Sequence, residues 1–282
     1  MYSISKDKIT INNTQDFNIA HILECGQIFR YTKLSDRYVV YSNQYKAEIL
    51  ETNTGYEIIT NNVDYFVNFF DLSTDYAQIK QQLKKEEKIS QAIDYCYGIR
   101  ILNQDPLESI IGFIISANNN IPRIKKSLNE LCERYGSNMG DYYAFPTIEQ
   151  LSKITKEQFE ELGTGYRASQ LVKAVEQLKT FDFDKLRTLD TDKAIEELLK
   201  ISGVGPKVAD CILLFGYHNM QVFPVDTWIE KMYNAYFSDT VVTDRKLIRK
   251  LLTTKFGELS GYAQQYLFYF KRYEDGKINN RR

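Results

Sequence analysis

Lys207 and Asp226 are the two residues whose types and positions in the sequence could do chemistry. Lys207 follows Gly203-Val204-Gly205-Pro206, and because proline is favoured at the first helical position, the lysine is expected in the first turn of a helix. The positive end of the helix dipole is expected to lower the pKa of its amine, which would make it a better nucleophile at neutral pH. Asp226 follows Pro224-Val225 and opens an apolar-periodic segment, so it is predicted to cap another helix.

Each of these features also has a structural explanation that involves no chemistry. Most first-turn lysines are solvated, most such aspartates only cap helices, and glycine hairpins between helices occur without ligands. A helix, a Gly203-Val204-Gly205 hairpin and a second helix nevertheless suit DNA, because backbone N–H groups and a helix N-terminus can donate to a phosphate. Glycine lets the backbone approach without a Cβ in the way. Such a hairpin would grip a strand without reading its sequence.

The elements that would position these residues fall into two groups. Residues 1–60 are rich in β-formers, and the turns between them predict an antiparallel meander over 38–41, 47–50 and 56–59. Apolar residues take a helical period from Val63, and Asp105-Pro106 predicts the start of a buried central helix over 107–116. Beyond Thr147 the period predicts helices at about 153–161, 167–179, 191–201, 206–217, 227–237, 243–256 and 260–272. The predicted fold class is α+β: a mixed strand and helix domain over residues 1–100, then a helical domain over 101–282.

The composition is that of an ordinary soluble globular protein, with 43% hydrophobic and 26% charged residues. The net charge of −1 gives no overall attraction to nucleic acid, so DNA binding would need a local basic face. The four cysteines are scattered and none lies beyond Cys211, which excludes a C-terminal iron–sulfur loop. Two distant histidines do not suggest a zinc site. No signal-type or membrane-spanning apolar run occurs, so a cytoplasmic location is expected.

Several motifs together resemble a known family of DNA repair enzymes. The run from Gly203 to Cys211 and the later Phe223-Pro224-Val225-Asp226 resemble the helix–hairpin–helix DNA glycosylase superfamily. Four further blocks look like the 8-oxoguanine DNA glycosylase family within it: Cys25-Gly26-Gln27-Ile28-Phe29-Arg30, 98–106, 113–121 and 162–168. They run in the family's order from about residue 24 to 270, so the resemblance covers nearly the whole chain. The compact chain is similar to a short prokaryotic-type member.

The resemblance implies a bifunctional DNA glycosylase and AP lyase of base excision repair. Lys207 would attack C1′ of a flipped nucleotide, expel the base and form a Schiff base, and β-elimination would nick the strand 3′ to the lesion. Asp226 would stabilise positive charge on the sugar. No metal or organic cofactor is implied, although the family hairpin can hold a cation on backbone carbonyls, here those of Leu199, Ile201 and Val204. The partner would be duplex DNA containing 8-oxoguanine, bound by a monomer.

The same resemblance assigns recognition of the damaged base. 8-Oxoguanine carries a hydrogen on N7 where guanine has a lone pair, and the carbonyl of Gly26 would accept it. Guanine would be rejected there, because mismatched polar groups give large discrimination. Gln264 would bond to the Watson–Crick edge, with Phe268 stacked on one side of the base and Cys211 on the other. Apart from the resemblance, Gly26 would be simply a turn, and Cys211 and Phe268 would be core residues.

Four residues match family positions that face the opposite strand. Asn118, Arg123 and Arg167 would contact the cytosine left behind, because their donors suit its O2 and N3 acceptors, and Tyr166 would fill the gap as a wedge. This implies a preference for lesions opposite cytosine, with plain phosphate binding by the two arginines as the alternative. Trp228 departs from the family pattern, in which a number of members have a histidine near the scissile phosphate.

Two other functions remain open from the sequence. One is a related glycosylase for another damaged base, against which the missing cysteine cluster and the presence of Gly26, Gln264 and Phe268 argue. The other is a non-catalytic helix–hairpin–helix DNA-binding protein. Such a protein would not need Lys207 and Asp226 together, and it would usually carry more positive charge. Borohydride trapping on a duplex with one 8-oxoguanine opposite cytosine distinguishes these readings.

Overall fold

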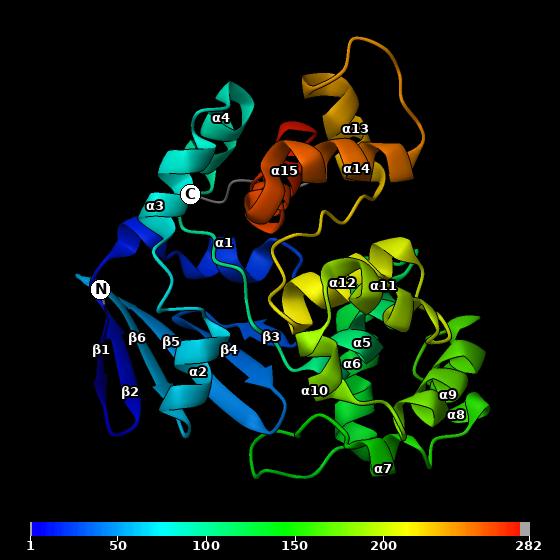
Figure 1. Ribbon diagram of the computed structural model, residues 1–282. Coiled ribbons are helices and arrows are strands. Elements are labelled where there is room, and N and C mark those ends of the chain that lie inside the picture. Colours follow the sequence, from blue (N-terminus) through cyan, green and yellow to red (C-terminus); the bar gives the residue numbers. More distant parts are fainter. Residues whose placement is uncertain (1, 277–282) are drawn as a thin grey trace.

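A six-stranded antiparallel sheet forms the N-terminal part of the computed structural model, which describes residues 2–276 (Figure 1). The strand order is β1-β2-β6-β5-β4-β3. The bounds are β1 Tyr2–Ser5, β2 Lys8–Ile11, β3 Tyr31–Lys33, β4 Arg37–Ser42, β5 Tyr45–Thr52 and β6 Gly55–Thr60. The predicted meander is therefore confirmed as β4, β5 and β6. The sequence pattern did not predict the short strands β1, β2 and β3 individually.

One face of the sheet is buried beneath helices. Its buried side chains alternate along the strands, as in the cross-strand pairs Val40–Ala47 and Ile49–Ile58. Helix α2 (Val63–Phe69) lies across the sheet (Figure 1) and contributes Phe66 and Phe69 to the same apolar cluster. Helix α1 (Ile19–Glu24) adds Ile22 and Leu23. The sheet thus holds one end of the loop that follows α1.

The rest of the chain is helical, so the predicted α+β class is confirmed. The helices are α3 Tyr76–Leu83, α4 Glu87–Tyr95, α5 Pro106–Ser116, α6 Ile121–Tyr135, α7 Ile148–Leu151, α8 Lys156–Glu161, α9 Arg167–Leu178, α10 Phe183–Thr188, α11 Thr191–Leu199, α12 Pro206–Gly216, α13 Thr227–Tyr236, α14 Arg245–Phe256 and α15 Ser260–Glu274. A helix was expected over 153–161, but α8 starts only at Lys156, because Thr155 and Gln158 form a capping box there. Helices α1, α7 and α10 were not predicted. Within residues 2–276, no helix is both long and apolar enough to cross a membrane.

Helix α5 lies at the centre of the helical part, as its sequence predicts. Asp105 caps it by accepting the Glu108 N–H at 2.9 Å, and Pro106 takes the first position. All of its residues from Glu108 to Ile115 are buried. Helix α12 packs against it, with Phe113 stacked on Phe215 at 5.6 Å between ring centroids. The helix that carries Lys207 is therefore supported along its length by the core.

The sheet and the helices are joined by a buried ion pair. Arg30 Nη1 lies 3.3 Å from the Glu108 carboxylate, and both side chains are almost fully buried. Glu108 also accepts the Asn43 N–H at 2.8 Å. Helices α3 and α4 pack into the core of the helical part, although they precede residue 100. The domain boundary near residue 100 stays a prediction.

We expect Glu108→Ala to lower the free energy of unfolding by about 3–5 kcal/mol, because Arg30 would stay buried without its anion. The matched control is Glu176→Ala, which removes one partner of the exposed pair with Lys179 and should change stability little. Urea unfolding followed by circular dichroism measures both variants. Equal losses in the two would contradict a structural role for the buried pair.

Candidate active site

The hairpin between α11 and α12 has the geometry that its glycines predict. The Val204 N–H donates to the Ile201 carbonyl at 3.1 Å and closes the turn. Gly203 has φ +85°, and a Cβ there would lie 3.0 Å from a methyl group of Ile114. Gly205 is the N-cap of α12, and a Cβ on it would meet nothing within 4 Å. The turn is therefore packed on one side and open on the other, where backbone N–H groups can meet a ligand.

Lys207, Cys211 and Asp226 come together at the start of α12. Lys207 lies in the first turn, its amine within hydrogen-bonding reach of the Cys211 sulfur and under the influence of the Asp226 carboxylate. Asp226 caps α13, as predicted: its Oδ1 accepts the N–H groups of Trp228 and Ile229 at 2.9 and 3.0 Å. This fixes one carboxylate oxygen at the helix end. The arrangement places a lysine amine in the field of a fixed anion.

The expected lowering of the Lys207 pKa is wrong. Burial of the amine acts to lower its pKa, but Cys211, Asp226 and Asp210 act in the opposite direction, and the pKa lies above that of ordinary lysine. The expectation failed because it considered only the dipole of the helix that carries the lysine. Cys211, one turn further along that helix, and Asp226, from another element, both raise the pKa of the amine. The raised pKa favours the ammonium form of Lys207 in the free protein.

The loop after α1 brings Gly26 against α15. Gly26 has φ +88°, and a Cβ there would lie 3.4 Å from Cε1 of Phe268. Gln265 of α15 donates through its side-chain amide to the carbonyl of Cys25, the residue before Gly26, at 2.9 Å. Both Gln265 and Cys25 are buried. The structure thus places two predicted base-recognition residues, Gly26 and Phe268, side by side.

Gln264 presents a buried acceptor at the same end of α15. Its Nε2 donates to the Pro224 carbonyl at 3.3 Å. Because a carbonyl only accepts, the amide nitrogen must face Pro224 and the amide oxygen must point elsewhere. Oε1 is buried and has no hydrogen-bond partner within the described residues. Such an atom is costly unless a ligand supplies a donor.

Arg167 is occupied by the backbone. Its guanidinium donates to the carbonyls of Ala117 at 2.7 Å, Asn118 at 2.8 Å and Thr164 at 3.1 Å. The side chain is buried, at 5% exposure. Contact with an opposite base would require it to exchange these partners, so its assigned role stays a prediction. What it does here is brace the turn after α5.

The other three residues assigned to the opposite strand lie at the surface. Tyr166 is 61% exposed and packs against Arg167, whose Cζ lies 4.4 Å from its ring centroid. Asn118 is exposed and has φ +51°, held by the turn that Arg167 braces. Arg123 is exposed in the first turn of α6. Asn118 and Tyr166 thus lie near each other, which a wedge and its polar neighbour require.

Sequence reasoning missed two arginines near the site. Arg249 of α14 binds Asp210 through two hydrogen bonds of 2.6 and 2.9 Å, which counters a carboxylate one turn beyond Lys207. Arg272 lies one turn beyond Phe268 on α15, and its Nη1 is buried without a hydrogen-bond partner among residues 2–276. The signal for Arg272 was its spacing, because residues 264, 268 and 272 share one helix face.

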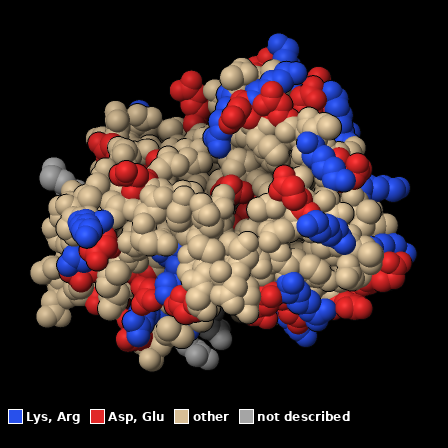
Figure 2. All heavy atoms as spheres, turned by 90° about the horizontal axis from the view of Figure 1, so that it is seen from below, with Lys and Arg blue, Asp and Glu red and all other residues tan. Residues whose placement is uncertain are grey.

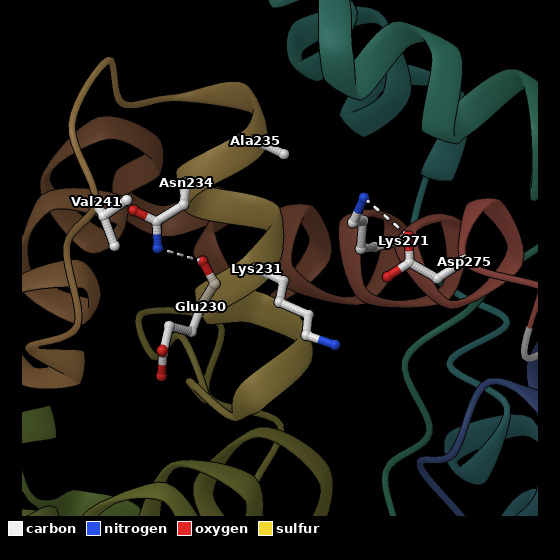
Figure 3. A pocket seen from close by; sticks show the side chains of 7 residues that line it. All are labelled: Glu230, Lys231, Asn234, Ala235, Val241, Lys271 and Asp275. Carbon is white, nitrogen blue, oxygen red and sulfur yellow. Dashed lines mark hydrogen bonds and ion pairs between the residues drawn. The ribbon is translucent and has the colours of Figure 1, made fainter.

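A hollow at the surface near α15 does not belong to this site. It measures about 540 Å³ and lies between α13 and α15, lined by Lys231, Lys271 and Asp275 among others (Figure 3). Lys271 pairs with Asp275 at 3.1 Å, and none of the predicted site residues lines the hollow. On the face in Figure 2, basic and acidic side chains are interspersed around a largely uncharged area. That face is not the local basic surface expected for DNA binding.

Comparison with known proteins gives consistent matches over nearly the whole chain. Residues 8–110 match the model of the 8-oxoguanine DNA glycosylase N-terminal domain, and residues 111–257 match that of the HhH-GPD superfamily of base excision DNA repair proteins. The N-glycosylase/DNA lyase of Saccharomyces cerevisiae is 30% identical over 93% of this chain and 85% of its own length. The N-glycosylase/DNA lyase OGG1 of Arabidopsis thaliana is 34% identical over 66% of this chain, but the match spans 55% of that protein.

A solved structure resembles the whole fold. The 8-oxoguanine glycosylase/lyase of Clostridium acetobutylicum, in complex with double-stranded DNA containing cytosine opposite 8-oxoguanine, is 37% identical. It superposes with a TM-score of 0.91 over 98% of both chains. Both parts of the fold, the sheet and the helices, are therefore shared with that enzyme. The chain belongs to the 8-oxoguanine DNA glycosylase family of the helix–hairpin–helix superfamily.

Proposed function

We propose that this protein is a bifunctional DNA glycosylase and AP lyase that removes 8-oxoguanine from duplex DNA. One observation carries the proposal: the Lys207 amine, close to Asp226 and Cys211, lies on the helix that follows an open glycine hairpin. A binding protein would have no use for an amine held beside a fixed carboxylate. Membership of the family and the neighbouring Gly26–Phe268 pair favour 8-oxoguanine over other damaged bases.

The proposed reaction begins with transfer of a proton from the Lys207 ammonium to water. The amine then attacks C1′ of the flipped nucleotide, the C1′–N9 bond breaks, and its electron pair leaves with the base, which takes up a proton. The charge of Asp226 stabilises the positive charge that develops on the sugar. Opening of the sugar ring gives a Schiff base between Lys207 and C1′. Removal of a C2′ proton then expels the 3′ phosphate and nicks the strand.

Recognition of the base would use acceptors on both of its edges. The Gly26 carbonyl accepts the N7 hydrogen that guanine lacks. The unpartnered Oε1 of Gln264 accepts an N–H of the Watson–Crick edge, where guanine-type bases are donors. Phe268 and Cys211 would hold the two faces of the ring. Because a buried acceptor without a donor is costly, the wrong base is penalised at either edge.

Contacts with DNA outside the base pocket would come from three places. The N–H groups around Gly203, Val204 and Gly205 hold a phosphate at the start of α12. Tyr166 fills the gap left by the flipped nucleotide. Asn118, Arg123 and Arg167 bind the remaining cytosine, which gives the preference for that base. We further infer a monomer that acts in the cytoplasm on genomic DNA.

Borohydride should trap a covalent adduct between the protein and a duplex with 8-oxoguanine opposite cytosine. Lys207→Gln should abolish the adduct and retain DNA binding, whereas Asp226→Asn should slow it about 10²–10³-fold because the cap persists without its charge. The control Lys179→Gln, which replaces an exposed lysine at the C-terminal end of α9, should trap normally. An adduct in Lys207→Gln would assign the nucleophile elsewhere.

The rate of trapping should rise from neutral pH to about 9, because the raised pKa of Lys207 makes its neutral amine the minor form at neutral pH.

Gly26→Ala should reduce excision of 8-oxoguanine by about tenfold or more while leaving cleavage at a preformed abasic site intact. The added Cβ would stand 3.4 Å from Phe268, inside the base pocket, and alanine disfavours the positive φ. Gly140→Ala is the matched control, because Gly140 also has a positive φ, +101°, but no atom within 4 Å of a Cβ. Single-turnover rates on both substrates measure the effect. Equal loss at the abasic site would contradict a role confined to the base.

Arg123→Ala should narrow the preference for cytosine opposite the lesion by about tenfold, since a good polar contact contributes roughly 1–3 kcal/mol of base discrimination. Single-turnover excision opposite each of the four bases gives the preference. Arg134→Ala serves as the control, because Arg134 is an arginine of the same helix whose charge is paired with Glu161 at 3.2 Å. A uniform loss opposite all four bases would instead assign Arg123 to the phosphates.

A further inference from the structure

Arg272 borders the base pocket from the side opposite Gln264. The two residues share a face of α15 with Phe268, which lies between them at one-turn intervals. The Arg272 Cζ lies 5.3 Å from the ring centroid of Phe268. Its Nη1 would stand 3.5 Å from a Cβ built on Gly26. The guanidinium therefore lies over the Phe268 ring and beside Gly26, the two residues that are proposed to hold the lesion.

One nitrogen of the guanidinium has no acceptor among the described residues. This atom, Nη1, is buried. Burial lowers the pKa of Arg272, and Asp226 is among the groups that oppose this effect. A buried donor without an acceptor is costly, so natural proteins seldom keep one without a reason. An acceptor brought by a ligand would supply that reason.

The base that is proposed to enter this pocket carries acceptors at the right place. With the N7 hydrogen of 8-oxoguanine on the Gly26 carbonyl, the oxygens O6 and O8 flank that hydrogen bond. Both are carbonyl-type acceptors, and a guanidinium offers only donors. A donor beside Gly26 therefore faces one of these two oxygens. Guanine has O6 but no O8.

We propose that Arg272 is a further base-recognition residue, whose Nη1 donates to the carbonyl oxygen of 8-oxoguanine beside N7. The proposal rests on the proposed function, because it requires the damaged base to lie against Gly26 and Phe268. The oxidised purine thus meets a donor as well as the acceptors of Gly26 and Gln264. Phe268 holds the guanidinium in place by a cation–π contact.

The test compares Arg272→Met with Lys271→Met. Methionine keeps an unbranched apolar chain beside Phe268 but has no donor. Lys271 is the preceding residue of α15 and carries the same charge, but it lines the hollow with Asp275. Single-turnover excision of 8-oxoguanine opposite cytosine and cleavage at a preformed abasic site are measured for each. Thermal unfolding of each variant is followed alongside.

Arg272→Met should slow excision by about tenfold to a hundredfold, as expected for loss of a charged hydrogen bond, and change abasic-site cleavage by less than about twofold. Lys271→Met should leave both rates within about twofold. Equal loss on both substrates would overturn the proposal in favour of a phosphate contact, and normal excision would overturn it outright. If the methionine variant is unstable, Arg272→Leu replaces it in the same comparison, because leucine is also apolar and offers no donor.

The proposal and the proposed function fail in different ways. If the unaltered protein does not excise 8-oxoguanine, the proposed function is wrong; if it does and Arg272→Met does so equally well, only the role of Arg272 is wrong. Competition binding with 8-oxoadenine, which retains O8 but has an amino group at position 6, identifies the oxygen. The affinities of the unaltered protein and of Arg272→Met are compared for each base. If the substitution weakens binding of 8-oxoadenine as much as that of 8-oxoguanine, Arg272 binds O8; if it weakens binding of 8-oxoadenine clearly less, Arg272 binds O6.

Discussion

The hydrogen bond from the Gln265 amide to the Cys25 carbonyl joins the first part of the chain to its last helix. Water cannot replace it, since both groups are buried. Gly26 follows Cys25 directly, so this bond sets where its carbonyl lies relative to α15. From the other side, the Gln27 side chain donates to the Arg100 carbonyl at 2.8 Å and accepts the Leu102 N–H at 2.9 Å. The loop that carries Gly26 is thus held by hydrogen bonds on both of its sides.

The catalytic half of the site depends on charge rather than on loop geometry. Two carboxylates lie near Lys207, but Asp210 is neutralised by the two hydrogen bonds from Arg249. Asp226 is held differently, by backbone N–H groups that fix one oxygen and leave its charge in place. The two carboxylates and Cys211 thus favour the ammonium form of Lys207. An ammonium is not nucleophilic, which suits an enzyme that spends most of its time on undamaged DNA.

Local features could be predicted from the sequence, and long-range ones could not. The hairpin at 203–205, the cap at Asp226 and the central helix follow from neighbouring residues, whose preferences agree with the fold. The pKa of Lys207 is raised by Cys211, one turn further along the same helix, and by a carboxylate 19 residues away in the chain, and the sign of this shift was predicted wrongly. Arg272 gave no signal beyond its spacing, because only the fold brings it to Gly26. Gln264 and Phe268 were found through the family resemblance.

The Arg167 guanidinium donates hydrogen bonds to three backbone carbonyls and so fixes the turn that carries Asn118. Under the proposed contact with the base opposite the lesion, Arg167 would have to exchange these carbonyls for acceptors on that base. Cytosine presents two such acceptors on one edge, O2 and N3. The proposed preference for cytosine would then come from how well its acceptors replace the carbonyls that Arg167 gives up.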